Sequence, residues 1–290
     1  MTMRSGAPAL AALAATAFFA AAQAEPTLLW ETKGFSTPES VLAVPAEGFA
    51  YVSNVAGNPL DKDGNGFISK VSLADGKIIA RKWAEGLNGP KGMALSNGKL
   101  FVSDVDKLVE IDPATGKITA SHEVADPGFL NDVAADANGN VYMTDSNTSS
   151  IWRLADGKLE KWVDGAELKY PNGVFVEGDS IIVAPWGPPG TTGKPAEPAG
   201  LLKLSIADKK IEALGDGTPV GNLDGIEADG DDYLVSDWVA GKVFRIAKSG
   251  KAELLLDLGQ GAADIGYDPA SKTLLVPMMK DDLVRAYKVQ

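Results

Sequence analysis

Hydrophobic and polar residues alternate along most of the chain in short runs, which Gly, Asn and Asp interrupt. Alternation with a period of two is typical of strands that bury one face, and no helical period is sustained. One stretch shows four such runs in succession, at 132–135, 141–144, 150–154 and 159–163. Four dipeptides predict tight hairpin turns, because both central residues of a type I′ turn need positive φ: Asp75-Gly76, Asn97-Gly98, Asn138-Gly139 and Asp156-Gly157. The pattern predicts an all-β protein.

The four-strand unit recurs at intervals of roughly 40 to 50 residues, the period of a propeller blade. The last unit lacks its fourth strand, while an unassigned strand at 27–32 precedes the first unit. We therefore expect a six-bladed β-propeller closed by the N-terminal strand. An open solenoid is the alternative, although the chain has no capping repeats. Six units align at these steps: Pro38-Glu39-Ser40, Pro90-Lys91-Gly92, Leu130-Asn131-Asp132, Pro171-Asn172-Gly173, Leu223-Asp224-Gly225 and Ala263-Asp264-Ile265.

The N-terminus predicts a secretory signal peptide over residues 1–24. Arg4 precedes an apolar run, Ala9 to Ala22, that is too short to span a bilayer and ends in Ala22-Gln23-Ala24. Residues 25–290 would then form one exported domain. The absence of cysteine excludes disulfides and thiolate zinc sites and favours a bacterial periplasm, with secretion as the alternative.

Net charge narrows the range of partners. The chain has 39 acidic and 27 basic residues, for a formal charge of −12. A field of this sign repels nucleic-acid phosphates and anionic lipid. We expect a small-molecule substrate or ligand, with a protein partner as an alternative, and neither nucleic acid nor membrane.

A polar residue occupies the same point of every unit, next to apolar strands. The innermost strand of a blade begins at the channel mouth, so these side chains should converge there. Oxygen donors without His or Cys suit Ca²⁺, or less closely Mg²⁺ or Mn²⁺. The preference of Asn and Asp for turns is the alternative explanation of the polarity. The predicted ring is Glu39, Lys91, Asn131, Asn172, Asp224 and Asp264.

Two long loops, Asn54 to Phe67 and Trp186 to Gly200, should wall the same mouth. The first loop contains Asp61-x-Asp63-x-Asn65-Gly66, which resembles the start of an EF-hand. Its twelfth position is Ser72 and no helices flank it, so a turn-rich connection is favoured over a second calcium site. For Trp186 and Trp238, packing between blades is the alternative to a pocket role. The ends of the second strands add these predicted pocket residues: Asn54, Asp104, Asp145, Trp186, Asp237, Trp238 and Met278.

At the first residues of its units, Glu39, Asn131-Asp132, Asn172-Gly173 and Asp224-Gly225, the chain resembles the senescence-marker-protein/gluconolactonase family of regucalcin-like propellers. The resemblance covers nearly all of residues 25–290 and implies that Glu39, Asn131, Asn172 and Asp224 hold one divalent metal, calcium or zinc in that family. It also implies lactonase or related esterase activity. Lys91 departs from the family pattern, and its ammonium could compete with a metal, pair with Asp264 or bind a substrate carboxylate. Two segments, Gly92-Met93-Ala94 and residues 138–145, are similar to NHL-repeat propellers, many of which only bind partners.

Two functions follow from these residues. The first is a metal-dependent hydrolase of a lactone or related ester, with Asp224 as general base and Lys91 or Asn54 steadying the oxyanion. The only histidine, His122, falls in an outer strand at 118–124, where a surface position is expected, so the base should be a carboxylate. The second is a non-catalytic propeller that binds a small molecule or protein partner.

Overall fold

The computed structural model describes residues 2–3, 25–191, 194 and 196–290 of the chain. The predicted signal peptide lies outside the described residues, apart from Thr2 and Met3. The described residues form β-strands and two short 3₁₀ turns, without an α-helix. No helix among them has the length and apolar composition that crossing a bilayer requires.

Six four-stranded antiparallel sheets form the blades of a propeller, as predicted. Blade 1 is β2 (Pro38–Val44), β3 (Phe49–Asn54), β4 (Gly66–Ser72) and β5 (Ile78–Leu87). Blade 2 is β6 (Met93–Ser96), β7 (Lys99–Ser103), β8 (Lys107–Ile111) and β9 (Ile118–Glu123). Blade 3 is β10 (Leu130–Ala135), β11 (Val141–Asp145), β12 (Ser150–Ala155) and β13 (Lys158–Asp164). Blade 4 is β14 (Pro171–Glu177), β15 (Ser180–Pro185), β16 (Leu202–Ser205) and β17 (Ile211–Ala213). Blade 5 is β18 (Leu223–Asp229), β19 (Asp232–Asp237), β20 (Lys242–Ala247) and β21 (Ala252–Asp257).

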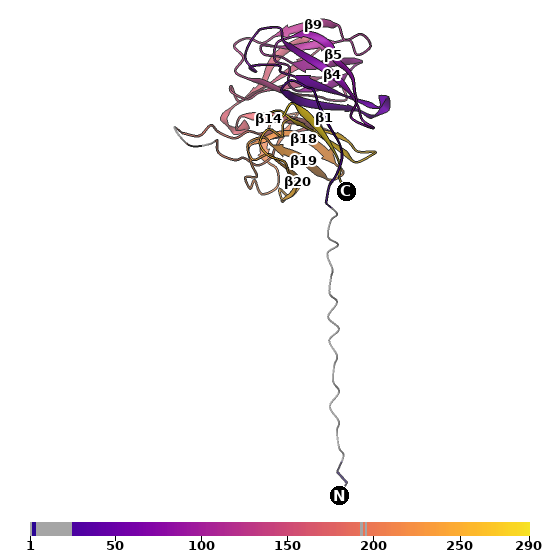
Figure 1. Cartoon of the computed structure of the whole chain (residues 1–290). Helices are drawn as coiled ribbons and strands as arrows, with labels where there is room; N and C mark the ends of the chain where they lie inside the picture. The colour runs from indigo at the N-terminus through magenta and orange to yellow at the C-terminus, as the bar shows by residue number, and fades with distance from the viewer. Residues whose placement is uncertain (1, 4–24, 192–193, 195) are drawn as a thin grey trace.

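Blade 6 joins the two ends of the chain, which confirms the predicted closure. It consists of β22 (Gly266–Asp268), β23 (Thr273–Met278), β24 (Leu283–Lys288) and the N-terminal β1 (Thr27–Lys33), in the order β1-β24-β23-β22. Figure 1 shows β1 beside the yellow C-terminal strands, and the pairing runs antiparallel between β1 and β24. β1 therefore covers the strand edge that β24 would otherwise expose.

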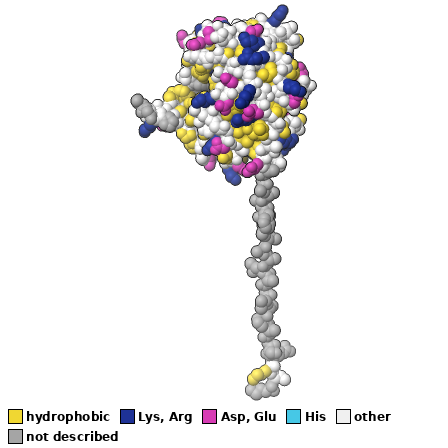
Figure 2. Space-filling view, viewed as in Figure 1, with side chains coloured by type: hydrophobic (Ala, Val, Ile, Leu, Met, Phe, Trp, Pro, Cys, Tyr) yellow, Lys and Arg dark blue, Asp and Glu magenta, His cyan; other side chains and the backbone are white. Residues whose placement is uncertain are grey.

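Hydrophobic side chains fill the space between neighbouring blades. Tyr51 of blade 1 packs with Leu100 of blade 2, and Tyr142 of blade 3 packs with Ile181 of blade 4. Because side chains of a strand point alternately to the two faces, each sheet presents apolar residues to both neighbours. This packing fixes the blades around the channel. Figure 2 shows acidic and basic side chains interspersed over the face in view.

The predicted type I′ turns form at two of the four places. At Asn97-Gly98 and Asp156-Gly157 both residues have positive φ, between 48° and 76°. At Asp75-Gly76 and Asn138-Gly139 only the glycine does, with φ of 71° and 87°. The loops that connect β4 to β5 and β10 to β11 are longer than two residues. Longer hairpin loops are commonly built around a type I turn followed by one left-handed residue, which is the glycine here.

Candidate metal centre and its pocket

A cavity of about 450 Å³ opens where the inner strands of the blades begin. Five of the six predicted ring residues line it: Glu39, Lys91, Asn131, Asn172 and Asp224. The rest of the lining comes from the loops around them: Pro59, Leu60, Phe129, Ser146, Asn147, Tyr170, Trp186, Trp238 and Met279. The two long loops thus contribute to the pocket, through Pro59 and Leu60 in one and Trp186 in the other.

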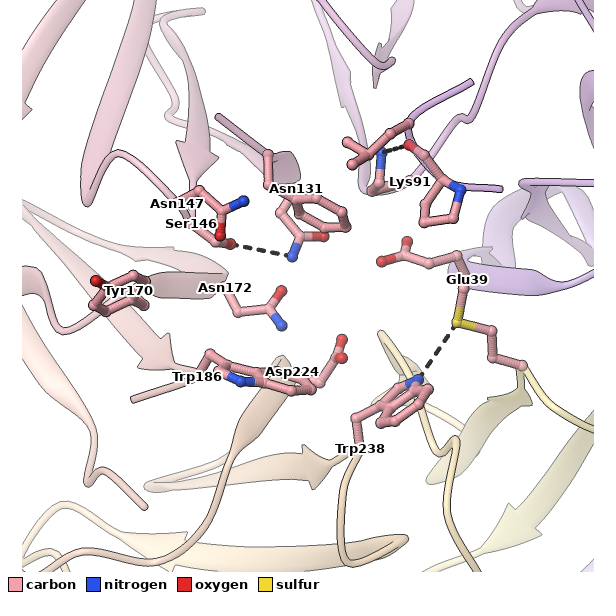
Figure 3. Close-up of a pocket in the computed structure, with 14 residues that line it drawn as sticks. Glu39, Lys91, Asn131, Ser146, Asn147, Tyr170, Asn172, Trp186, Asp224 and Trp238 are labelled. Atoms are coloured by element: carbon pink, nitrogen blue, oxygen red, sulfur yellow. Dashed lines mark hydrogen bonds between the residues drawn. The ribbon is translucent and has the colours of Figure 1, made fainter. Parts of the chain in front are cut away.

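Four oxygen-bearing side chains point toward one another in this cavity: Glu39, Asn131, Asn172 and Asp224 (Figure 3). Each comes from a different blade, and each is at most 6% exposed. Glu39 Oε2 and Asp224 Oδ1 are buried and have no hydrogen-bond partner. A buried carboxylate oxygen without a partner is costly, and a hard cation would relieve that cost.

The electrostatics agree with this geometry. Burial raises the pKa of Glu39 well above 4.5, and the charges of Asp224 and Asp264 raise it further. Burial also raises the pKa of Asp224 well above 3.8, aided by Asp264 and opposed by the Asn172 amide. Two carboxylates and two amides satisfy the ligand chemistry of Ca²⁺. No group of three or more His, Cys, Asp or Glu side chains is arranged for a metal in the described residues, so the amides are essential to this candidate site.

A β-bulge re-aims each of the four ligand side chains. The register of the first strand pair shifts between Pro38 and Val41 in blade 1, and the same shift falls at Asn131, Asn172 and Asp224 in their blades. A bulge turns one side chain out of the regular alternation of a strand. The polar side chains can therefore point along the channel while the strand after them keeps its apolar packing.

Hydroxyl groups of the preceding blade hold the backbone of the two amide ligands, a feature that the sequence reading missed. Thr144 Oγ1 donates to Asn172 O at 2.8 Å, and Ser103 Oγ donates to Asn131 O. A Ser/Thr-Asp/Asn dipeptide at the end of the second strand in blades 1, 2, 3 and 5 was the signal available in the sequence. In blades 2, 3 and 5 its first residue donates to the inner strand of the next blade, and its second residue has another task.

That second residue was predicted to line the pocket, and the structure places it elsewhere. Asp104 Oδ1 accepts the Gly89 amide at 2.7 Å, and Asp145 Oδ1 accepts the Phe129 amide at 2.8 Å. These carboxylates fix the loop that enters their own blade, because they satisfy its buried N–H groups. Asn54 Oδ1 likewise accepts the Ser36 amide at 2.9 Å. The Asp237 carboxylate accepts hydrogen bonds from the backbone amides of Asn222, Val239 and Ala240. None of these four side chains lines the cavity.

The following residue lines the pocket in blades 3 to 6. Trp186 and Trp238 hold this position in neighbouring blades, and their rings lie 6.0 Å apart at 49°. Met279 lines the pocket in blade 6, whereas the predicted Met278 is fully buried in the core. One step along a strand reverses the direction of the side chain, which explains the difference.

Asp264 lies one position deeper in the channel than predicted. Met278 bridges to Ala262, as Asp237 pairs with Leu223 in blade 5, so Ala263 occupies the ring position. The Asp264 carboxylate accepts the Ser40 hydroxyl of blade 1 and lines a separate cavity of about 290 Å³. Burial raises its pKa to about 7. Asp264 therefore influences the electrostatics of the candidate metal centre without lining its cavity.

Lys91 lines the pocket, but its ammonium is held by the protein backbone. Lys91 Nζ donates to Gly89 O at 3.0 Å and to Pro59 O at 3.3 Å, and lies 4.8 Å from the centroid of the Phe129 ring. It forms no ion pair with a carboxylate within 4.0 Å among the described residues, Asp264 included. Burial lowers the pKa of Lys91, partly opposed by Glu39 and Asp104. Two of the three N–H donors of Lys91 are thus bonded to backbone carbonyls. The amide of Asn54 is bonded within its own blade, and Asn54 does not line the cavity, so it is not placed to steady an oxyanion there.

The remaining predicted features lie away from the pocket. His122 Nε2 is 2.8 Å from Glu110 Oε1 on the outer part of blade 2, where it is partly buried rather than freely exposed. In the loop that resembles an EF-hand, Asp63 accepts the Asn65 amide at 3.0 Å in an exposed turn. This contact is typical of a turn-rich connection, the interpretation that the sequence favoured.

No protein-family model matches the sequence, and a search of characterised proteins finds no sequence relative. Solved structures do share the fold. A gluconolactonase from Xanthomonas campestris has a TM-score of 0.67 at 15% identity, with 89% of this chain and 88% of that chain covered. The calcium-binding protein regucalcin from Agrobacterium tumefaciens has a TM-score of 0.63 at 19% identity, with 92% and 96% covered.

A third similar structure is virginiamycin B lyase from Staphylococcus aureus, with a TM-score of 0.59 at 17% identity, covering 90% of this chain and 98% of that chain. At such identities the similarity shows a shared propeller fold and nothing finer. The gluconolactonase and regucalcin propellers agree with the predicted resemblance at the level of fold.

Proposed function

We propose that this chain is a divalent-cation-dependent hydrolase of a lactone or related ester. The observation that carries the proposal is the convergence of Glu39, Asn131, Asn172 and Asp224, with two carboxylate oxygens left unpartnered inside a ligand-sized cavity. These four residues would hold the cation, and Ca²⁺ fits their oxygens best, with Mg²⁺, Mn²⁺ or Zn²⁺ as alternatives. The gluconolactonase and calcium-binding regucalcin folds support the same direction.

Bound at this site, the cation would supply a Lewis acid for the substrate carbonyl oxygen. Asp224 is the proposed base and takes a proton from the attacking water, because it lines the cavity and keeps one oxygen without a partner, a property it shares with Glu39. The water oxygen bonds to the carbonyl carbon, and the bond from that carbon to the ring or ester oxygen breaks. Asp224 returns the proton to the departing oxygen, giving an acid and an alcohol. Asn131 and Asn172 orient the reacting groups and keep their own backbone fixed through Ser103 and Thr144.

A lyase is less well supported by this pocket. The related virginiamycin B lyase becomes catalytically inactive when one histidine is replaced by alanine. The single histidine of this chain, His122, pairs with Glu110 outside the cavity. The pocket therefore offers carboxylate chemistry.

Metal content and lactone hydrolysis of the purified protein test the proposal together. We expect about one calcium per chain, activity that chelator removes and Ca²⁺ restores, and loss of both in the Asn131→Ala, Asn172→Ala double variant. Asp63→Ala, which removes a carboxylate from the exposed loop, is the matched control and should keep both. Calcium that survives the double variant but not Asp63→Ala would refute the proposed site.

A further inference from the structure

The wall above the four oxygen ligands is apolar. Leu60, Phe129, Trp186, Trp238 and Met279 form most of it. Leu60 is 52% exposed, so a ligand would cover an apolar side chain that now faces water. A cavity of about 450 Å³ lies in the range that holds small organic ligands.

Several polar groups of the wall form hydrogen bonds within the protein. Ser146 Oγ donates to Pro171 O at 2.7 Å and accepts Asn131 Nδ2 at 3.3 Å. Trp238 Nε1 donates to Met279 Sδ at 3.4 Å. The Tyr170 hydroxyl points away from the four oxygen ligands (Figure 3). The polar groups left over, chiefly Asn147 Oδ1 and the indole N–H of Trp186, are outnumbered by the apolar side chains of the lining.

Lys91 organises this apolar wall. Its ammonium holds Pro59 O, which places Pro59 and Leu60 over the pocket, and it lies over the Phe129 ring. Lys91 is 1% exposed, so its ammonium contacts groups of the wall rather than solvent. Lys91 is a positioning residue for this wall.

We infer that the substrate is a carbonyl compound with an apolar body, which lies against Leu60, Trp186 and Trp238 while its carbonyl group faces the four oxygen ligands. The inference rests on the proposed function, since the carbonyl group is placed at the proposed metal centre. A polyhydroxylated sugar lactone would bury hydroxyls against aromatic and aliphatic side chains. Each unpaired hydroxyl would cost about 5- to 150-fold in affinity.

Two lactones with the same six-membered ring test the inference. D-glucono-1,5-lactone carries hydroxyls, whereas δ-decalactone carries a pentyl chain. Because each buried methylene contributes about fourfold, burial of two or three carbons of the pentyl chain should favour δ-decalactone by roughly 10- to 100-fold in kcat/KM, normalised to uncatalysed hydrolysis. Trp186→Ala should reduce this preference by about tenfold, and Trp186→Phe should retain most of it. Leu254→Ala, an exposed change on β21, is the control and should leave the preference unaltered.

Calcium titration of every variant separates this inference from the proposed function. A preference for gluconolactone, or an equal preference in wild type and Trp186→Ala, overturns the apolar-substrate inference while hydrolysis stands. If neither lactone is hydrolysed, the proposed function fails, and quenching of tryptophan fluorescence decides the inference. Quenching by δ-decalactone but not by gluconolactone would then support it, and any other result would overturn it. Lys91→Met should lower the δ-decalactone preference while calcium binding persists, and an unchanged preference would refute the role given to Lys91.

Discussion

Replacing Asp224 by Asn should raise the stability of the metal-free protein and remove most of the stabilisation that calcium gives. Asp224 is 4% exposed and its Oδ1 has no partner, so the metal-free protein holds an uncompensated buried carboxylate. Neutralising it should raise the free energy of unfolding at pH 7 by about 1–3 kcal/mol. For a domain of this size, that corresponds to an increase in Tm of about 2–12 °C.

Calcium should stabilise wild type by about 2.3 kcal/mol more than Asp224→Asn, which reverses the order of the two proteins wherever the gain from neutralisation is below that value. At a concentration one hundred times Kd, calcium stabilises wild type by about 2.7 kcal/mol, or about 5–11 °C. Asp224→Asn lacks one carboxylate ligand, so a hundredfold loss of affinity would leave about 0.4 kcal/mol. Calorimetry in chelator and in calcium gives all four Tm values.

Asp145→Asn is the matched control for this prediction. Both Asp145 oxygens accept backbone amides, from Gly128 at 2.9 Å and Phe129 at 2.8 Å, so an amide group there would face N–H donors. We expect this variant to lose about 1–3 kcal/mol in either condition and to keep the full calcium response. The reasoning fails if Asp224→Asn is destabilised in chelator, or if calcium raises its Tm as much as that of wild type.

Three further predictions concern the channel and the ring. Burial raises the pKa of Asp264 from 3.8 to about 7 and that of Glu227 from 4.5 to about 8. The folded protein therefore binds more protons than the unfolded chain between about pH 4 and pH 8, and the free energy of unfolding should fall as the pH rises through this range. Denaturant unfolding without divalent cations should show this fall, and a rise would contradict it. A Cβ on Gly173 would lie 2.0 Å from Asp224 O, so Gly173→Ala should lower the free energy of unfolding by about 3 kcal/mol and weaken calcium binding in titration calorimetry. In the control Gly57→Ala the Cβ meets nothing closer than 3.6 Å, and neither quantity should change. Deleting β1 should expose the edge of β24 and cause association in size-exclusion chromatography, and a stable monomer would argue against the closure.

The sequence determined the blades and four members of the candidate site. Glu39, Asn131, Asn172 and Asp224 occupy the same local position in their units, and the ring geometry of a propeller brings such positions together. Local alternation and turn composition were sufficient for this, because the repeat carries the same short-range information six times. The closing strand followed from one missing and one unpaired strand, since a sheet edge needs a partner.

Only the tertiary structure decided the register and the partners of single side chains. The pairing of Ala262 with Met278 puts Ala263 at the ring position predicted for Asp264, and a difference of one residue reverses the direction of a strand side chain. Asp104 and Asp145 have the residue types of ligands, yet their oxygens meet backbone amides that only the folded loops bring near. Lys91 likewise acquired its role from a carbonyl 32 positions earlier in the chain. Contacts between distant loops depend on packing of the whole ring, and no local pattern encodes them.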